Sequence, residues 1–226
     1  MQWGQSALLL MGAACVALGG WCMYAESGPV LRAGTTPLAR LQAISGPQDP
    51  VGAGAATIRS VLIDCQQVLL SYDSAAMRLQ PPENRAELLD ICDGMARAAL
   101  RHTPAHGQAE MILALVADQR DDPAAAEVHL ARSQALEPGM AWLASQRVPV
   151  RERRFEELSE EAREWHSRDL SLLLHSEPGK WQLAQLYLGD EAARERIGVA
   201  LQQVPEQLQT AFITAVRDLM HSRAAL

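Results

Sequence analysis

The sequence contains almost no lysine, and its basic residues are outnumbered by acidic ones. Lys180 is the single Lys, so Arg supplies nineteen of the twenty basic residues, and with the abundant Ala this usage indicates a GC-rich bacterial genome. The formal net charge is −7. Binding to nucleic acid requires a clustered basic face that displaces counterions. The sequence has no such face and disfavours a nucleic-acid partner.

One local basic cluster interrupts the acidic background. It consists of Arg147, Arg151, Arg153 and Arg154, and it is followed at once by Glu156, Glu157, Glu160 and Glu161. Opposite charges so close along the chain indicate a solvated, self-neutralising helix start. A patch for lipid headgroups or for an acidic partner is the alternative.

Patterns typical of metal sites are also missing. His102 and His106 are four residues apart, but Pro104 between them marks a helix boundary, so the two rings need not share a face as zinc ligands would. The cysteine spacing matches no two-by-two metal pattern. We predict no metal site and no cofactor.

A single segment concentrates groups that could act as acid and base. It contains Glu161, Glu164, His166 and Asp169. Helical offsets of three, two and three scatter these side chains around the axis, so a charged outer face explains them, with the following leucines turned inward. We predict no catalytic residue and no enzymatic activity; a hydrolase of cell-wall polymers is the alternative that this pattern leaves open.

An uncharged apolar stretch occupies residues 6–25, close to the start of the sequence. Twenty helical residues cover the hydrocarbon core of a bilayer. Trp3 precedes the stretch, and Trp21 and Tyr24 lie at its far end, where aromatic rings favour membrane interfaces. We therefore predict a single-pass transmembrane anchor over residues 1–25. The alternatives are a cleaved signal peptide and a processed lipoprotein, but the stretch lacks a basic leader region and a lipobox.

The sequence gives two opposing indications of orientation. Arg32 and Arg40 follow the span within the window of the positive-inside rule, which favours a cytoplasmic domain. Bacterial single-span proteins with a very short N-terminus, in contrast, usually export their large C-terminal domain. We predict a bacterial inner-membrane protein whose soluble domain is periplasmic.

Two further regions follow the anchor. Residues 26–56 are rich in Gly, Pro, Ser, Thr and Ala, which predicts a flexible linker with a short helix around Pro37–Ile44. Residues 57–226 show helical periodicity almost throughout, as in the stripe Ile58, Val61, Leu62, Cys65, Val68, Leu69 and Tyr72. We predict a single all-α domain of eight or nine helices, with helix starts at Thr103-Pro104, Asp122-Pro123, Asp190 and Pro205.

Cys65 and Cys92 lie on the buried stripes of two consecutive helices separated by Pro81-Pro82. An antiparallel hairpin would bring them within about one helical turn of each other. In an oxidising compartment they could form a disulfide that stabilises the domain by roughly 3 kcal/mol. Two reduced, buried thiols are the alternative.

The middle of the domain carries small residues and a proline at regular positions. Counting Gly107 as the first position, Ala114 is eighth, Ala126 twentieth, Leu130 twenty-fourth, Ser133 twenty-seventh and Pro138 thirty-second, and Cys92, Ala96, Ala99 and Pro104 occupy the late positions one period earlier. This pattern resembles the tetratricopeptide repeat, a helix-turn-helix of 34 residues. Glu110 and Ala117 depart from it, and the next period downstream does not match.

The resemblance implies a solenoid or bundle that binds proteins in a groove between its helices. The chain is also loosely similar to small anchored helical-repeat proteins of envelope and exopolysaccharide machinery. Trp142 and Trp181 each begin an apolar helix just after a Pro-Gly turn, and we predict them as partner-binding residues because such rings are frequent in interface hot spots. The predicted function is a non-enzymatic, membrane-tethered scaffold or assembly factor for an envelope complex of secretion or polysaccharide export. A structural subunit of a large membrane enzyme is the alternative.

Overall fold

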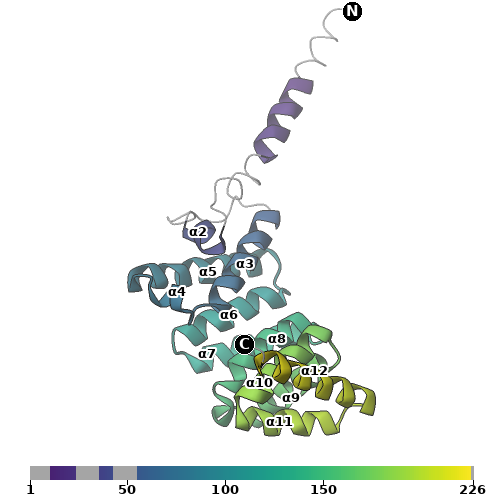
Figure 1. Ribbon diagram of the computed structural model, residues 1–226. Coiled ribbons are helices and arrows are strands. Elements are labelled where there is room, and N and C mark those ends of the chain that lie inside the picture. The colour runs from purple at the N-terminus through teal and green to yellow at the C-terminus, as the bar shows by residue number, and fades with distance from the viewer. Residues whose placement is uncertain (1–10, 24–35, 43–54, 225–226) are drawn as a thin grey trace, which may run out of the picture. The chain divides into compact units, whose positions relative to one another are not determined.

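The computed structural model describes residues 11–23, 36–42 and 55–224, and this part of the chain contains helices and no strand (Figure 1). The predicted all-α class is confirmed. The labelled helices are α2 (Pro37–Gln42), α3 (Ala55–Leu70), α4 (Ala75–Arg78), α5 (Pro82–His102), α6 (Gly107–Gln119), α7 (Pro123–Leu136), α8 (Ala141–Glu152), α9 (Glu160–Leu174), α10 (Glu177–Gly189), α11 (Glu191–Gln202) and α12 (Glu206–Ala224), with a 3-10 turn, η2 (Phe155–Glu157). Within residues 55–224 this makes ten α-helices where the sequence predicts eight or nine.

Residues 11–23 form one further helix, whose side chains are all exposed. Among the described residues, none of the helices combines the length and the apolar character that crossing a bilayer requires. The predicted span over residues 6–25 is described only from 11 to 23, and its remaining residues lie outside the described part of the chain.

The chain divides into two compact units at Pro104, one comprising residues 1–104 and the other residues 105–226. This boundary falls inside the range 57–226, which the sequence analysis treats as one domain. In the first unit α3 and α5 pack against each other. They run antiparallel, because contacts join Cys65 to Cys92 and, just beyond the end of α3, Tyr72 to Arg85 near the start of α5.

Cys65 and Cys92 are joined by a disulfide, with their Cα atoms 5.6 Å apart. The structure therefore brings together the two cysteines that the sequence analysis pairs. They lie level with each other rather than one turn apart, because the short helix α4 takes up part of the connection between α3 and α5.

Helix α2 packs onto α3 and α5 from within the predicted linker. Its Leu41 is fully buried, and its Arg40 donates two hydrogen bonds to Asp64 of α3, at 2.7 and 2.5 Å. A short helix is thus present where the sequence predicts one. The consequence is that the compact unit begins before residue 57.

The second unit stacks helical hairpins. The pairs α6/α7, α8/α9 and α10/α11 each pack together, α6, α8, α10 and α12 pack in succession, and α7, α9 and α11 do the same. The first helices of the hairpins begin at Gly107, Ala141 and Glu177, so the steps are 34 and 36 residues. The hairpin order therefore continues past the point where the sequence pattern stops matching.

Capping explains most of the helix starts in this unit. Asp122 accepts a hydrogen bond from the Ala125 amide at 3.0 Å, and Asp190 accepts one from the Ala193 amide at 2.9 Å. These two predicted caps are confirmed, as is the helix start after Pro205. The predicted start at Thr103-Pro104 is wrong. Thr103 ends α5, and His106 caps α6 instead, because its Nδ1 accepts a hydrogen bond from the Ala109 amide.

Gly179 lies where α10 approaches the end of α9. A Cβ at this position would be 2.5 Å from the Leu173 carbonyl oxygen and 2.8 Å from the Leu173 Cα, which are backbone atoms that cannot turn away. We expect Gly179→Ala to lower the free energy of unfolding by about 1–3 kcal/mol in urea titrations. Gly198→Ala in α11 is the control, since a Cβ there meets nothing within 4 Å. It should stabilise by about 0.5–1 kcal/mol, and equal effects of the two changes would contradict the prediction.

Candidate partner-binding site

The two predicted partner-binding residues lie on the surface of the second unit. Trp142 is 41% exposed in the first turn of α8, and Trp181 is 40% exposed in α10. The Gln182 side chain, next to Trp181 in sequence, donates a hydrogen bond to the Ser145 carbonyl at 2.5 Å and so links α10 to α8. One detail of the sequence interpretation is wrong: Pro178 and Gly179 are not a turn before a helix but part of the first turn of α10.

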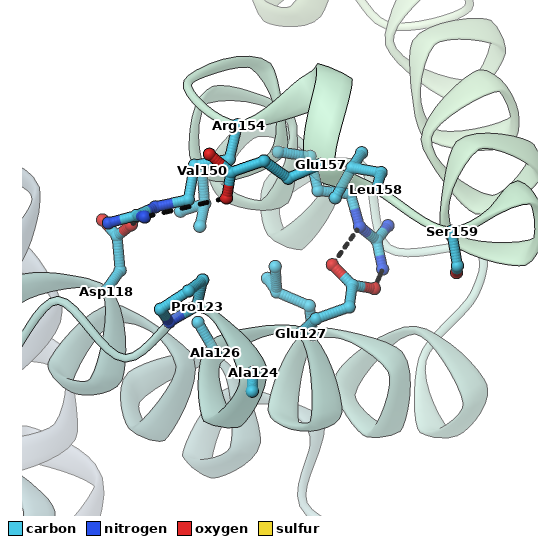
Figure 2. Close-up of a pocket in the computed structure, with 12 residues that line it drawn as sticks. Asp118, Pro123, Ala124, Ala126, Glu127, Val150, Arg154, Glu157, Leu158 and Ser159 are labelled. Carbon is cyan, nitrogen blue, oxygen red and sulfur yellow. Dashed lines mark hydrogen bonds and ion pairs between the residues drawn. The ribbon is translucent and has the colours of Figure 1, made fainter.

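A cavity of about 350 Å³ in the same unit has no counterpart among the predicted sites (Figure 2). It lies between α7 on one side and, on the other, the end of α8 and the connection to α9 at residues 153–159. Its surface is mainly apolar and comes from Pro123, Ala124, Ala126, Leu130, Val150 and Leu158. A pocket of this size is at the small end of ligand sites, which usually measure about 300–1,000 Å³.

Ion pairs flank this cavity at both ends, as Figure 2 shows. At one end Glu127 receives two hydrogen bonds from Arg151, at 2.8 and 3.2 Å. At the other end Arg154 donates to Asp121 at 2.5 Å and lies 3.8 Å from Asp118. The hydrogen bond to Asp121 is the main cause that raises the pKa of Arg154 above its ordinary value, so this guanidinium stays charged.

A buried ionic network lies behind the cavity wall. Arg147 donates to both carboxylate oxygens of Asp169, at 2.8 and 2.7 Å, and these side chains are 0% and 1% exposed. Arg151 is also buried and donates to Gln134 at 2.7 Å. The interpretation of the basic cluster as a solvated helix start is therefore wrong for Arg147 and Arg151. Their partners come from α7 and α9, which the local sequence does not reveal.

A second buried cluster links α8, α9 and α11. Glu152 of α8 lies 2.8 Å from His166 Nε2 and accepts hydrogen bonds from Arg196. His166 and Asp169 are buried, whereas Glu161 and Glu164 are exposed. The interpretation of this segment as one charged outer face is thus wrong for His166 and Asp169, because the structure supplies each of them with a buried partner of opposite polarity.

Two opposing effects set the pKa of Glu152. Burial raises the pKa of this carboxyl, but the hydrogen bonds from His166 and Arg196 together outweigh burial, and the pKa lies below the ordinary value of 4.5. The carboxylate form is therefore favoured in the folded state. Its contribution to stability is present in full above pH 4.5 and is lost as the pH falls through the lowered pKa.

The lowered pKa of Glu152 predicts a pH dependence of the free energy of unfolding, and substitution of Glu152 isolates it. We expect the free energy of unfolding of the wild type to fall more steeply below pH 4.5 than that of Glu152→Gln, whose amide does not titrate. Urea titrations of both proteins between pH 3 and 7 measure the difference. Curves that stay parallel over this range would contradict the assignment.

The arrangement offers surfaces for binding. Among the described residues no group of acidic, His and Cys side chains has the geometry of a metal site. The cavity can take an apolar side chain, and its charged ends can hold a polar group beside it. Neither the cavity nor the buried arginines were predicted, although Arg147 and Arg151 lie four residues apart, on the helical face that also carries the buried Leu143 and Ala144.

Comparison of the chain with protein-family models, with curated proteins and with solved structures finds no match.

Proposed function

We propose that the chain is a membrane-tethered adaptor of the bacterial cell envelope whose helical-repeat unit binds partner proteins. The observation that carries this proposal is the packing of the second unit, in which three hairpins and a terminal helix follow one another in constant order. Stacked helix pairs of this kind create extended surfaces that recognise other proteins. The resemblance of residues 107–138 to a tetratricopeptide repeat agrees with it, since Ala114, Ala126, Leu130 and Ser133 are all buried.

The exposed tryptophans support a binding role for this unit. Trp142 and Trp181 present large apolar rings on two helices that pack against each other and share a hydrogen bond. Tryptophan is enriched among the residues that dominate binding energy at interfaces. We therefore place partner contacts at these two exposed rings.

Two features support the tether and its side of the membrane. The sequence from residue 6 to 25 is uncharged and apolar, and its described part, residues 11–23, is helical with exposed side chains such as Val16, Leu18 and Trp21. The disulfide between Cys65 and Cys92 favours an oxidising compartment, because disulfides rarely persist in the cytosol. We therefore propose that the anchor is in the inner membrane and that both compact units are periplasmic.

Partner capture tests the adaptor role. The tagged full chain is expressed in the bacterium that encodes it and extracted from its membranes with a mild detergent, and the proteins that accompany it are quantified by mass spectrometry. We expect a reproducible set of proteins that falls at least about fivefold in the variant Trp142→Ala/Trp181→Ala. The control is Val199→Ala/Ile213→Ala, which removes two apolar side chains of similar exposure from α11 and α12.

The outcomes of this capture experiment distinguish an adaptor from a permanent structural subunit and test the role of the two tryptophans. Absence of any reproducible companion would reject the adaptor role, and equal capture by both variants would reject the tryptophan surface. Companions that remain in fixed stoichiometry through further purification would instead favour a permanent structural subunit of a larger complex.

Thiol labelling tests the proposed compartment. Cys15 and Cys22 are free and exposed, so both are first replaced by Ser, which leaves Cys65 and Cys92 as the reporters. In intact spheroplasts a membrane-impermeant maleimide should label them only after reduction and unfolding outside the membrane. Labelling that requires opening of the membrane would place the units in the cytoplasm.

A further inference from the structure

The cavity beside α7 has an apolar interior that nothing in its own unit fills. Leu130 of α7 and Val150 of α8 are buried in its walls, and Leu158 of the α8–α9 connection closes it on the far side (Figure 2). Ala124 lies exposed at its edge. With a volume of about 350 Å³ the cavity suits a few side chains of a peptide rather than a folded domain.

The arginines around this cavity already have carboxylate partners. Arg151 is fully buried and donates to Glu127 and to Gln134. Arg154 donates to Asp121 and also lies 4.0 Å from Glu157. An incoming carboxylate would therefore compete with the carboxylates that already lie beside each guanidinium.

The carboxylates, in contrast, retain oxygens that face the solvent. The side chains of Asp121 and Glu157 are 86% and 66% exposed, whereas those of Arg153 and Arg154 are 46% and 27% exposed. Among the charged residues that line the cavity, the carboxylates of Asp118, Glu127 and Glu157 outnumber the guanidinium groups of Arg151 and Arg154, so the net charge is negative and complements a cation.

We propose that this cavity binds a short segment of a partner protein in which an apolar side chain lies next to Lys or Arg. The inference rests on the proposed adaptor function and adds a second contact to it, separate from Trp142 and Trp181. The apolar side chain enters between α7 and Leu158, and the basic side chain lies against Asp121 and Glu157. An acidic segment is disfavoured, because it would bring like charges together at the mouth.

Two variants separate the apolar and the charged parts of this site. Ala124→Trp fills the cavity from an exposed position, so the core is left unchanged. Asp121→Asn/Glu157→Gln removes the two most exposed carboxylates. Asp121 has a positive φ of 58°, a conformation that Asn adopts readily, so this double variant keeps its fold. The matched control Glu195→Gln/Asp218→Asn removes two exposed charges from α11 and α12.

The test uses a library of random hexapeptides on beads, incubated with the labelled full chain in detergent. We expect the retained sequences to be enriched roughly tenfold in Lys or Arg next to an apolar residue, relative to Asp or Glu at the same place. Enrichment should vanish with Ala124→Trp, fall severalfold with Asp121→Asn/Glu157→Gln, and persist in the control variant. It should also weaken at high salt.

Two results would overturn the site: a library without basic enrichment, or enrichment that Ala124→Trp leaves intact. Enrichment in acidic residues would overturn it as well, because the charge argument would then be reversed. The adaptor function is judged separately by partner capture through Trp142 and Trp181. If capture depends on the tryptophans while the library shows no preference, the adaptor stands and the peptide site falls.

Discussion

Replacement of Arg147 by Met is expected to lower the free energy of unfolding by about 3–5 kcal/mol. Arg147 and Asp169 are both buried and share two hydrogen bonds between α8 and α9. Met has a similar length, so the change creates little empty space, but it leaves the Asp169 carboxylate in the core with only Arg151, whose Nη1 is 3.6 Å away. Because small domains are stable by only about 5–15 kcal/mol in total, this loss is a large fraction.

Urea titration of the full chain, followed by circular dichroism, measures this effect. Arg168→Met is the matched control, since Arg168 pairs with Glu164 on the exposed face of α9, the helix that carries Asp169, and exposed pairs contribute at most about 1 kcal/mol. The double variant Arg147→Met/Asp169→Leu removes both charges and should recover most of the loss. Equal destabilisation by Arg147→Met and Arg168→Met would show that the buried pair has no special role.

Loss of the disulfide should destabilise the first unit by about 3 kcal/mol. Cys65 and Cys92 close a loop of 27 residues in sequence separation, which includes the whole connection between α3 and α5. When the bond is absent, the unfolded chain gains the conformational freedom that the crosslink removes. We expect Cys65→Ser/Cys92→Ser to lower the urea midpoint of this unit while the transition of the second unit stays unchanged.

Reduction provides the control for this prediction. A phosphine reductant should shift the wild-type transition toward that of the double variant and leave the double variant itself unaffected. A wild-type midpoint that does not respond to complete reduction would contradict a stabilising crosslink. Since the two cysteines are also the reporters of compartment, the same reduced and oxidised samples serve as standards for the labelling experiment.

The features that the sequence predicts are those with local causes. The caps Asp122 and Asp190 act on amides three residues away, and the short helix in the linker follows from Pro37 and the apolar residues after it. The all-α fold class is likewise predicted from the spacing of apolar residues within each helical segment. The pairing of Cys65 with Cys92 needs only the further assumption of one antiparallel hairpin.

The features that sequence analysis misses depend on partners that are distant along the chain. Arg147 and Arg151 are read as solvated because four glutamates follow them, yet their partners are Asp169 and Glu127, 22 and 24 residues away. The burial of His166 is missed for the same reason, because its partner Glu152 lies on the preceding helix. A sequence pattern alone does not distinguish a charge that is neutralised by its neighbours along the chain from one that is paired with a residue of another helix.

The cavity beside α7 is missed because it is formed where two successive hairpin turns approach each other. Asp118 lies at the end of α6 and Pro123 at the start of α7, on either side of their turn, and Leu158 lies in the connection between α8 and α9. Each of these residues has an ordinary local role at a helix end. These residues come close together only because the hairpins stack. The repeat period is irregular in this part of the sequence, so the stacking cannot be predicted from it.

In the proposed topology, the docking of α2 also limits how far the folded unit can extend from the anchor. Because Arg40 is held by Asp64 and Leu41 is buried, only residues 24–35 separate the helix of residues 11–23 from the folded unit. A chain of this length spans at most about 45 Å, against about 110 Å for a free stretch from 26 to 56. In the proposed topology the segment between the anchor and the folded unit is therefore short. A partner must itself lie close to the bilayer surface to be bound.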